Sequence, residues 1–472
     1  MTSEYDVVIV GAGTGGYVAA IRAAQLGQRT AVVEQHVALG GTCLHRGCIP
    51  TKALLEHAHA FKIVQDAKTW GITLGEAAVS IDMKQVQARK NRIIKNLSKG
   101  LEFLFKKNKI EWIRGCGRLL APGRLEVNDN GTSKTISARE IVLATGSTPR
   151  TVPGIEIDHQ RIITSDQAMM LDHAPPSMII LGSGAVGVEF ASIFQRFGVD
   201  VTLIEIMDRL VPLEDVAVSK ELERSFRKQG IRILTDTKVT AAMSEADHVR
   251  VEATGPKGEI EHFEAAYLLV ATGRGPVTNN LVADDVDLKL EHGFIRVDEL
   301  YRTSVQGVSA VGDVITLGWP GHPQLAHLSS AEGILVAERI AGRKVTPLNY
   351  GHVPSCVYCE PEIGSVGLTE EVAIQRGHRV RVGTFPFGVL GRAKISGDTD
   401  GFVKIVSDEQ DDKILGLHMI GPRATELIAE AALALRMECT SLDLGRTIHA
   451  HPTLSEAIAE AAHATHGDAI HA

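Results

Sequence analysis

The sequence predicts an α/β protein with two Rossmann-like dinucleotide-binding domains and a C-terminal α+β domain. Two similar segments support this prediction. Each begins with an apolar run, residues 5–10 or 178–181, and passes directly into a glycine-rich turn and an alanine-rich helical stretch. Each then reaches a second strand-like run that ends in a glutamate, and each later closes on Ala-Thr-Gly. We therefore expect each segment to form one dinucleotide-binding unit.

The composition is that of a multidomain globular protein. The chain has 472 residues, more than a single core of about 250–300 residues accommodates. Hydrophobic residues make up 44% and charged residues 22%, which excludes a disordered or fibrous chain. The net charge of −8 argues against a nucleic-acid partner, and no apolar run is long enough to span a membrane. A first strand close to Met1 and only six cysteines indicate a reducing, cytoplasmic location without a targeting peptide.

The two glycine-rich turns have the spacing of dinucleotide fingerprints. Their glycines are Gly11, Gly13 and Gly16 in the first turn and Gly182, Gly184 and Gly187 in the second. Glycine lets the backbone approach a pyrophosphate, whose charge lies at the N-terminus of the following helix. Glu34 and Glu205 each stand 18 residues after the last glycine, where a carboxylate accepts hydrogen bonds from a ribose diol. Because the carboxylate of Glu205 would repel a 2′-phosphate, we predict NAD rather than NADP in the second unit.

Two cysteines five residues apart, Cys43 and Cys48, precede a helix that we expect to open at Pro50. If the intervening loop turns, the two sulfurs can meet the geometry of a disulfide. The helix N-terminus, with Arg46 and Lys52 nearby, would stabilise a thiolate. Zinc would require two further ligands, which this stretch does not provide. Because the pair lies inside a dinucleotide-binding unit, we interpret it as a redox pair to which a flavin could pass electrons.

The rest of the chain carries weaker signals. We expect a helix over residues 52–65, a strand over 305–313 that ends in Gly-Asp, strands over 401–406 and 413–419, and a helix over 425–437. Cys356 and Cys359 are interpreted as inert core thiols on a strand, and His418 as a packed histidine. The charged run 106–109 is predicted to be a solvated face.

These motifs, together with the C-terminal segment from His449 to Glu456, resemble the pyridine nucleotide-disulfide oxidoreductases. The resemblance extends from Tyr5 to about Glu460. The C-terminal segment and the acid at Glu205 favour the branch that oxidises dihydrolipoyl groups over glutathione reductase. The resemblance implies FAD and NAD as cofactors, a homodimer, and lipoyl domains of 2-oxoacid dehydrogenase or glycine cleavage complexes as partners.

The resemblance also implies a division of the chain. Residues 1–150 would bind FAD and include the redox segment 40–65, and residues 151–275 would bind NAD. Residues 276–346 would return to the FAD or central domain, and residues 347–472 would form the dimer interface. The alternatives are another NAD(P)H-dependent disulfide reductase of the family or a non-catalytic scaffold. Mercuric reductase is disfavoured because the C-terminus lacks a cysteine pair.

Individual site residues follow from the same resemblance. Cys43 would be attacked by the dithiol and Cys48 would pass electrons to FAD. His451 would act as the base in the neighbouring subunit's site, with Glu456 as its orienting acid. The implied FAD contacts are Gly11, Gly13, Gly16, Glu34, Gly41, Thr42, Cys43, Lys52, Gly115, Thr145, Gly146, Ser147, Asp313, Gln324, Leu325, Ala326 and His327. The implied NAD contacts are Gly182, Gly184, Gly187, Glu189, Glu205, Val239 and Gly273, with Glu189 also paired to Lys52.

Two features qualify this assignment. His45 and Arg46 stand between the cysteines where the family commonly has asparagine and a variable residue, so we expect a changed local redox potential. His449 and His451 lie two residues apart, a spacing that could suggest a metal, but Pro452 and Glu456 fit the base of the family instead. No metal site is predicted.

Overall fold

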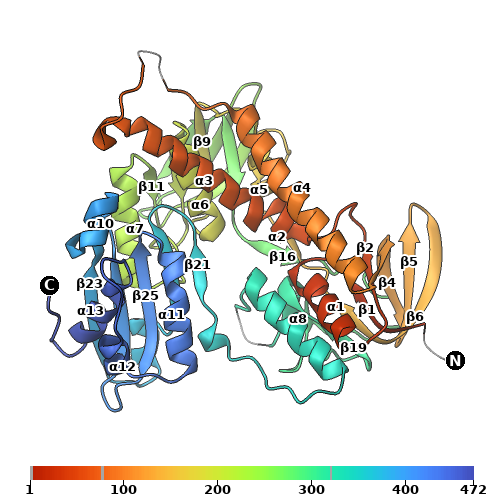
Figure 1. Cartoon of the computed structure of the whole chain (residues 1–472). Helices are drawn as coiled ribbons and strands as arrows, with labels where there is room; N and C mark the ends of the chain where they lie inside the picture. Colours follow the sequence, from red (N-terminus) through yellow and green to blue (C-terminus); the bar gives the residue numbers. More distant parts are fainter. Residues whose placement is uncertain (1–3, 76–78, 319–320, 472) are drawn as a thin grey trace. The chain divides into compact units, whose positions relative to one another are not determined.

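The structure, a computed structural model, describes residues 4–75, 79–318 and 321–471 (Figure 1). The chain divides into two compact units, each built from three separate segments. The first unit comprises Met1–Ala53, Lys84–Arg150 and Gly273–Leu348. The second comprises Leu54–Met83, Thr151–Thr272 and Asn349–Ala472.

The first unit is built on a seven-stranded sheet with the order β3-β2-β1-β6-β5-β4, in which β19 also pairs with β6. The central strand β1 is parallel to both neighbours, and its Val8 lies opposite Ala31 and Ile141. The parallel strands are β1 (Tyr5–Val10), β2 (Thr30–Glu34), β3 (Glu111–Arg114), β6 (Thr132–Leu143) and β19 (Val308–Ala310). The antiparallel strands are β4 (Cys116–Ala121) and β5 (Arg124–Asp129). The two strands predicted first, β1 and β2, are confirmed.

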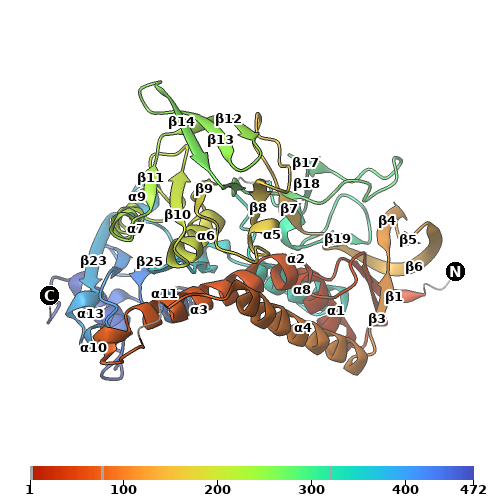
Figure 2. The same ribbon diagram turned by 90° about the horizontal axis from the view of Figure 1, so that it is seen from above.

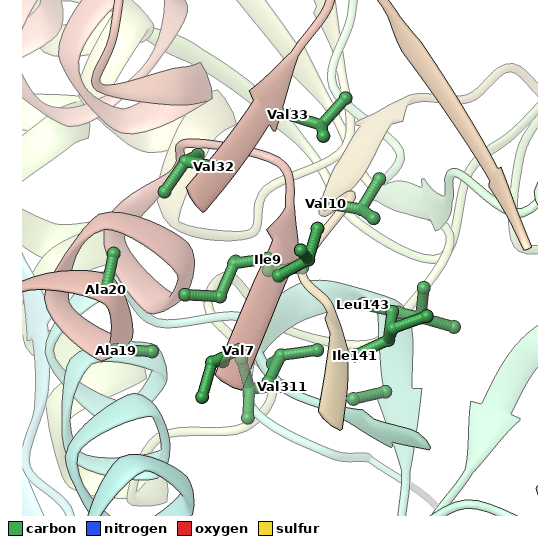
Figure 3. Close-up of a cluster of buried hydrophobic side chains, with 14 of the residues drawn as sticks. Val7, Ile9, Val10, Ala19, Ala20, Val32, Val33, Ile141, Leu143 and Val311 are labelled. Atoms are coloured by element: carbon green, nitrogen blue, oxygen red, sulfur yellow. The ribbon is translucent and has the colours of Figure 1, made fainter. Parts of the chain in front are cut away.

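The core of this unit forms because its central strands are apolar on both faces. Figure 3 shows Ile9 of β1 among side chains of β2, β6 and the helix α1 (Thr14–Gln25), all of them buried. On one side α1 packs against α8 (Ala326–Ile340) (Figure 1). The two helices can approach closely because Gly333 has no side chain. A Cβ at this position would lie only 2.5 Å from the carbonyl oxygen of Gly15. The strand expected to end at Asp313 ends at Ala310, and Asp313 lies in a 3₁₀ turn, Gly312–Val314.

The redox segment is more helical than predicted. Cys43 lies in a short helix, α2 (Gly41–Arg46), and Cys48 begins α3 (Cys48–Gln65), so the expected loop and the helix start near Pro50 are both corrected. Proline is tolerated there because the first turn of a helix needs no intrahelical N–H donor. The 25-residue helix α4 (Met83–Lys107) was not predicted. Lys106, Lys107 and Lys109 at its end are exposed, as expected.

The second unit contains a parallel sheet with the order β11-β10-β9-β15-β8. A separate three-stranded antiparallel sheet, β12-β13-β14, is inserted in the chain between β11 and β15 (Figure 2). The strands of the parallel sheet are β8 (Ile162–Thr164), β9 (Ser177–Leu181), β10 (Asp200–Ile204), β11 (Arg232–Leu234) and β15 (Tyr267–Val270). The other elements are α6 (Ala185–Arg196), α7 (Val216–Lys228), β12 (Lys238–Ser244), β13 (Val249–Thr254) and β14 (Ile260–Ala265). The predicted repeat of strand, turn and helix is confirmed.

The C-terminal part of this unit is an antiparallel sheet with the order β21-β22-β25-β24-β23, packed against helices. The strands and helices predicted here are confirmed within one or two residues, the usual uncertainty of element ends. The strands are β21 (Ser355–Val357), β22 (Glu362–Gly367), β23 (Val380–Pro386), β24 (Phe402–Asp408) and β25 (Ile414–Gly421). The helices are α9 (Glu370–Gln375), α10 (Gly391–Ser396), α11 (Ala424–Arg436), α12 (Ser441–Arg446) and α13 (Glu456–Ala464).

A buried ionic network joins β24 to the N-terminus of α7 within this unit. The ammonium of Lys404 donates to Asp215 at 2.9 Å and to Glu370 at 2.6 Å. Burial would raise the pKa of Asp215, but Lys404 and the amide of Ala217 hold it below its usual value. His418 lies opposite Lys404 on β25 and is fully buried, which lowers its pKa and confirms the expected packed histidine.

Among the described residues, no helix combines the length and the apolar character needed to cross a bilayer. The remaining short elements connect the larger ones. They are α5 (Ser165–Ala168), β7 (Ser147–Pro149), β16 (Arg274–Pro276), β17 (Leu290–Glu291), β18 (Phe294–Arg296) and β20 (Ile315–Thr316).

Candidate active site

The turn after β1 brings three backbone segments together so closely that only glycine fits. Gly11 has a φ of +103°, and a Cβ there would collide with the carbonyl oxygen of Ala144. A Cβ at Gly16 would collide with the carbonyl oxygen of Gly11. Gly13, the N-cap of α1, differs: no atom of the described residues lies within 4 Å of an added Cβ. The turn therefore leaves open space at the N-terminus of α1, where the helix dipole favours an anion.

The same construction recurs in the second unit. A Cβ at Gly182 would lie 2.6 Å from the carbonyl oxygen of Ala271, and one at Gly187 would collide with Gly182. Within the described residues, nothing lies within 4 Å of a Cβ added at Gly184, the N-cap of α6. Both predicted fingerprints thus form a strand, a tight turn and an open helix N-terminus.

Each predicted ribose-binding glutamate is buried and bound to its own turn. Glu34 accepts from the amides of Ala12 and His36, both at 2.8 Å. Glu205 accepts from the amide and the hydroxyl of Ser183, both at 2.7 Å, and from the amide of Met207. The carboxylates of Glu34 and Glu205 therefore lie beside the two open helix ends. The contacts to Ala12 and Ser183 were not foreseen, because sequence spacing does not show which atoms a carboxylate meets.

The cysteine segment is joined directly to the first turn. The amide of Gly40 donates to the carbonyl of Ala12 at 2.9 Å. Gly41 has a φ of +59°, and a Cβ there would lie 2.5 Å from the Cα of Gly13. Since α2 begins at Gly41, this contact sets Cys43 at a fixed offset from the dinucleotide turn.

Cys43 and Cys48 are brought together as predicted. Their thiols form a hydrogen bond, which together with burial raises the pKa of Cys43, while the charge of Lys52 lowers it. The break between α2 and α3 at Gly47 permits the approach, since a Cβ there would lie 3.0 Å from the carbonyl oxygen of Thr42.

The two unusual residues between the cysteines are held by local contacts. Nε2 of His45 hydrogen bonds to the carbonyl of Leu39 at 2.8 Å. The guanidinium of Arg46 lies 3.0 Å from Nε2 of His36.

Several predicted FAD contacts gather at the carboxyl ends of β6 and β19. The hydroxyl of Ser147 donates to Asp313 at 2.6 Å, and that of Thr145 donates to the carbonyl of Val277 at 2.6 Å. Arg274 donates to the hydroxyl and the carbonyl of Ser147. Arg274 was missed by the sequence reasoning, although it directly follows the second Ala-Thr-Gly.

The predicted segment 324–327 forms the N-terminus of α8. Leu325 is the N-cap, and Ala326 and His327 occupy the first turn. The side-chain Nε2 of Gln324 donates to the carbonyl of Asp313 at 3.4 Å. Glu332, also missed, is fully buried on this helix. It accepts from the amide of Gly312 at 2.7 Å and pairs with His322 at 2.9 Å, so it anchors the turn that carries Asp313.

The other predicted glycines and Val239 occupy defined positions. Gly115 has a φ of +135° and donates its amide to the carbonyl of Glu34. Gly146 and Gly273 also have positive φ values, and Gly273 belongs to the first unit. Val239 packs its side chain into the core of the second unit, which leaves its backbone for any nucleotide contact.

Glu189 lies on α6 in the second unit and is buried. The amide of Tyr358 donates to its carboxylate at 3.0 Å. Cys356 and Cys359 lie on either side of that tyrosine, and their sulfurs hydrogen bond to the carbonyls of Thr425 and Pro361 respectively. Burial raises the pKa of Cys359 well above its usual value. These contacts agree with two unreactive thiols.

His451 and Glu456 form the predicted pair. Nδ1 of His451 donates to Glu456 at 2.8 Å, and the other carboxylate oxygen accepts from the amide of Thr453. Burial opposes ionisation, but these two donors lower the pKa of Glu456. The imidazole of His451 is 78% exposed, so its Nε2 faces outward. His449 instead is buried and bound to Glu430 at 2.8 Å, a partner that sequence reasoning missed.

The two turns fit dinucleotides. Each offers an open position at a helix N-terminus and a buried carboxylate beside it, and a Cβ at Gly13 or Gly184 would project into that open position. Among the described residues, no group of three or more His, Cys, Asp or Glu side chains is arranged to hold a metal ion. Two dinucleotide turns, one of them joined to a cysteine pair, define a dinucleotide-dependent disulfide oxidoreductase.

The chain belongs to the pyridine nucleotide-disulphide oxidoreductase family. The model of this family matches residues 5–333, and the model of its dimerisation domain matches residues 353–462. The family comprises FAD-dependent disulfide oxidoreductases that use a pyridine nucleotide. The match to the dimerisation domain supports a homodimer.

Relatives and solved structures agree with this membership. A dihydrolipoyl dehydrogenase from Bacillus subtilis is 44% identical over 482 residues, covering 100% of both chains. A mitochondrial dihydrolipoyl dehydrogenase from Pisum sativum is 41% identical, covering 100% of this chain and 93% of its own. LpdA from Mycobacterium tuberculosis is 28% identical with a TM-score of 0.87, and covers 97% of this chain and 98% of its own. The flavoprotein disulfide reductase RclA from Escherichia coli is 26% identical with a TM-score of 0.86, and covers 98% of this chain and 99% of its own.

The glycine geometry predicts different outcomes for two neighbouring alanine variants. Gly16→Ala should fail to fold stably, because its Cβ would collide with the backbone of Gly11. Gly13→Ala should fold with unchanged circular dichroism but lose most of its bound FAD, because its Cβ enters only the open space at the helix end. The ratio of flavin to protein after gel filtration measures this difference. Wild-type FAD content in Gly13→Ala would contradict the placement of the cofactor at this turn.

Proposed function

We propose that this chain oxidises protein-bound dihydrolipoyl groups and passes the electrons through the Cys43–Cys48 pair and FAD to NAD⁺. The close contact between Gly41 and Gly13 carries this proposal, because it joins the cysteine helix to the dinucleotide turn. The names of the relatives in Bacillus subtilis and Pisum sativum support the choice of dihydrolipoyl substrate. The chain would serve 2-oxoacid dehydrogenase or glycine cleavage complexes in the cytoplasm, with their lipoyl domains as partners.

The cofactors would occupy the sites that the two turns provide. Residues 1–150 and 276–346 would hold FAD, with the pyrophosphate at α1, the ribose on Glu34 and the ribityl chain on Asp313. Residues 151–275 would hold NAD⁺ at α6 with its ribose on Glu205, and residues 347–472 would form the dimer contact. When bound, FAD accepts an electron pair from the cysteine pair and supplies a hydride to NAD⁺.

The protein residues would carry out the thiol chemistry. One substrate thiolate attacks the sulfur of Cys43, the bond between Cys43 and Cys48 breaks, and Cys48 leaves as a thiolate. The second substrate thiolate then displaces Cys43, which closes the lipoyl disulfide and leaves both cysteines reduced. The two electrons lost by the substrate thus reside on the cysteine pair.

His451 would take the proton from the attacking thiol through Nε2. Its Nδ1 is already bound to Glu456, whose carboxylate stabilises the imidazolium that forms. Because Nε2 faces outward from the chain and the family is dimeric, we place this base in the cysteine site of the partner copy. Lys52 would lie beside the flavin in the first unit, and Glu189 would belong to the NAD⁺ site of the second.

A substrate panel tests the proposed reaction. The holoenzyme should reduce NAD⁺ with dihydrolipoamide. Its kcat/KM should be at least about tenfold lower when the substrates are NAD(P)H and either the disulfide of glutathione, the disulfide of mycothiol or mercuric ion. Cys43→Ser should abolish the dihydrolipoamide reaction, yet still reduce an artificial flavin oxidant with NADH. Dihydrolipoamide turnover in Cys43→Ser would remove this cysteine from the pathway. A preference for another substrate would assign the chain to a different reductase of the family.

A mixed dimer tests the position of the base. Cys43→Ser and His451→Gln chains, each with a different affinity tag, are co-expressed and the mixed dimer is isolated. If His451 acts in the partner's site, one site carries both lesions and the other is intact, so about half of the wild-type activity returns. If His451 acts within its own chain, both sites are damaged and the mixed dimer remains as inactive as its parents. That result would contradict the shared site.

A further inference from the structure

Helix α4 concentrates positive charge in a chain that is acidic overall. Its residues Met83–Lys107 include eight lysines and arginines but only one acid, Glu102, whereas the whole chain has a net charge of −8. Lys90 is buried, and the other seven basic residues are exposed: Lys84, Arg89, Arg92, Lys95, Lys99, Lys106 and Lys107. The mechanism proposed above uses none of these side chains.

Five of these residues lie on one face of the helix. Successive steps of three or four residues connect them through Ala88 and Glu102, and such steps place side chains on the same side of a helix. The members of this basic stripe are Lys84, Arg92, Lys95, Lys99 and Lys106. At 1.5 Å per residue the stripe is about 33 Å long, which is far longer than a small-molecule ligand.

The stripe borders a cavity beside the redox segment. The cavity has a volume of about 400 Å³ and is lined by residues of α4 and α2, two elements of the first unit. Lys95 and Lys99 belong to both the stripe and the cavity wall, and His45 closes the wall from α2. His45 is two residues from Cys43. The basic stripe therefore extends from the surface of α4 to the helix that carries the reactive cysteine.

We propose that the basic stripe is the docking surface for an acidic protein domain that carries the dithiol on a flexible arm. This inference rests on the proposed function, which requires a protein-bound substrate to reach Cys43. Charge complementarity over about 33 Å favours a folded acidic domain over a small anion. A second copy of this chain is disfavoured, because a two-fold contact would set this face, with five basic residues and one acid, against itself. Of the exposed apolar side chains of α4, Leu97 lies off the stripe, whereas Phe103 lies beside it between Lys99 and Lys106.

The proposal separates two substrates by their charge. An acidic domain would be steered toward Cys43 by the stripe, so its association should weaken as salt screens the charges. Free dihydrolipoamide is uncharged and should react without this contribution. Reversing the charge of the stripe should therefore lower kcat/KM for the domain and leave kcat/KM for dihydrolipoamide unchanged.

The test uses the holoenzyme with the triple substitution Arg92→Glu, Lys95→Glu and Lys99→Glu. Its substrates are free dihydrolipoamide and a reduced lipoyl domain of net negative charge. At low ionic strength kcat/KM for the domain should fall about tenfold or more, and at about 0.5 M salt the variant should equal the wild type. The matched control carries the same charge change elsewhere, at the exposed Lys220, Lys257 and Lys344, and should retain its activity with both substrates.

Each other outcome overturns the proposal in a recognisable way. An unchanged kcat/KM for the domain, or an equal loss in the control, would remove α4 from docking. Dissociation of the dimer in the α4 variant alone would assign the stripe to the contact between copies. Salt-sensitive binding of a DNA duplex that only the α4 variant loses, with domain turnover unchanged, would assign it to nucleic acid. If the wild type oxidises neither substrate, the proposed function fails, whatever the stripe does.

Discussion

The structure depends on a close backbone contact in each dinucleotide-binding unit, at the glycine that directly follows its first strand. At Gly11 and Gly182 the chain passes so near to Ala144 and Ala271 that a side chain would collide with a carbonyl oxygen or lie only 2.6 Å from it. This contact turns the chain sharply and directs the N-terminus of the next helix into open space. In the first unit Gly41 extends the same contact to the helix of Cys43. One steric constraint thus determines both the place for a phosphate and the position of the redox pair.

Buried acids complete this arrangement in both units. Glu34 and Glu205 bind the amides of their own turns, and Glu332 binds the amide of Gly312 ahead of Asp313. Burying a carboxylate costs free energy unless hydrogen-bond donors surround it. Because the backbone amides of the turn supply these donors, each acid also holds its turn in one conformation. The pair of His451 and Glu456 follows the same rule, although its imidazole remains exposed and leaves one nitrogen for a substrate thiol.

Much of this could be predicted from the sequence, because repeated spacing is a strong signal. Both fingerprints with their flanking strands, the strands β24 and β25, and the approach of Cys43 to Cys48 were expected. Helix α4 was not predicted, because its buried side is interrupted by the polar residues Lys90 and Ser98 between Val86 and Phe105, so the apolar periodicity is weak. The start of α3 at Cys48 was missed because proline was read as the beginning of the helix. The partners of buried polar groups, such as Arg274 with Ser147, depend on segments far apart in the sequence, and no local pattern reveals them.

The central claim is that the cysteine pair and the flavin form one redox unit. Anaerobic titration of the oxidised holoenzyme with dithionite, followed by flavin absorbance and thiol counting, tests this claim most directly. We expect an uptake of about four electrons per FAD, two by the disulfide and two by the flavin, and about two in a Cys43→Ser, Cys48→Ser variant. Uptake of only two electrons by the wild type, with no new thiols formed, would contradict it.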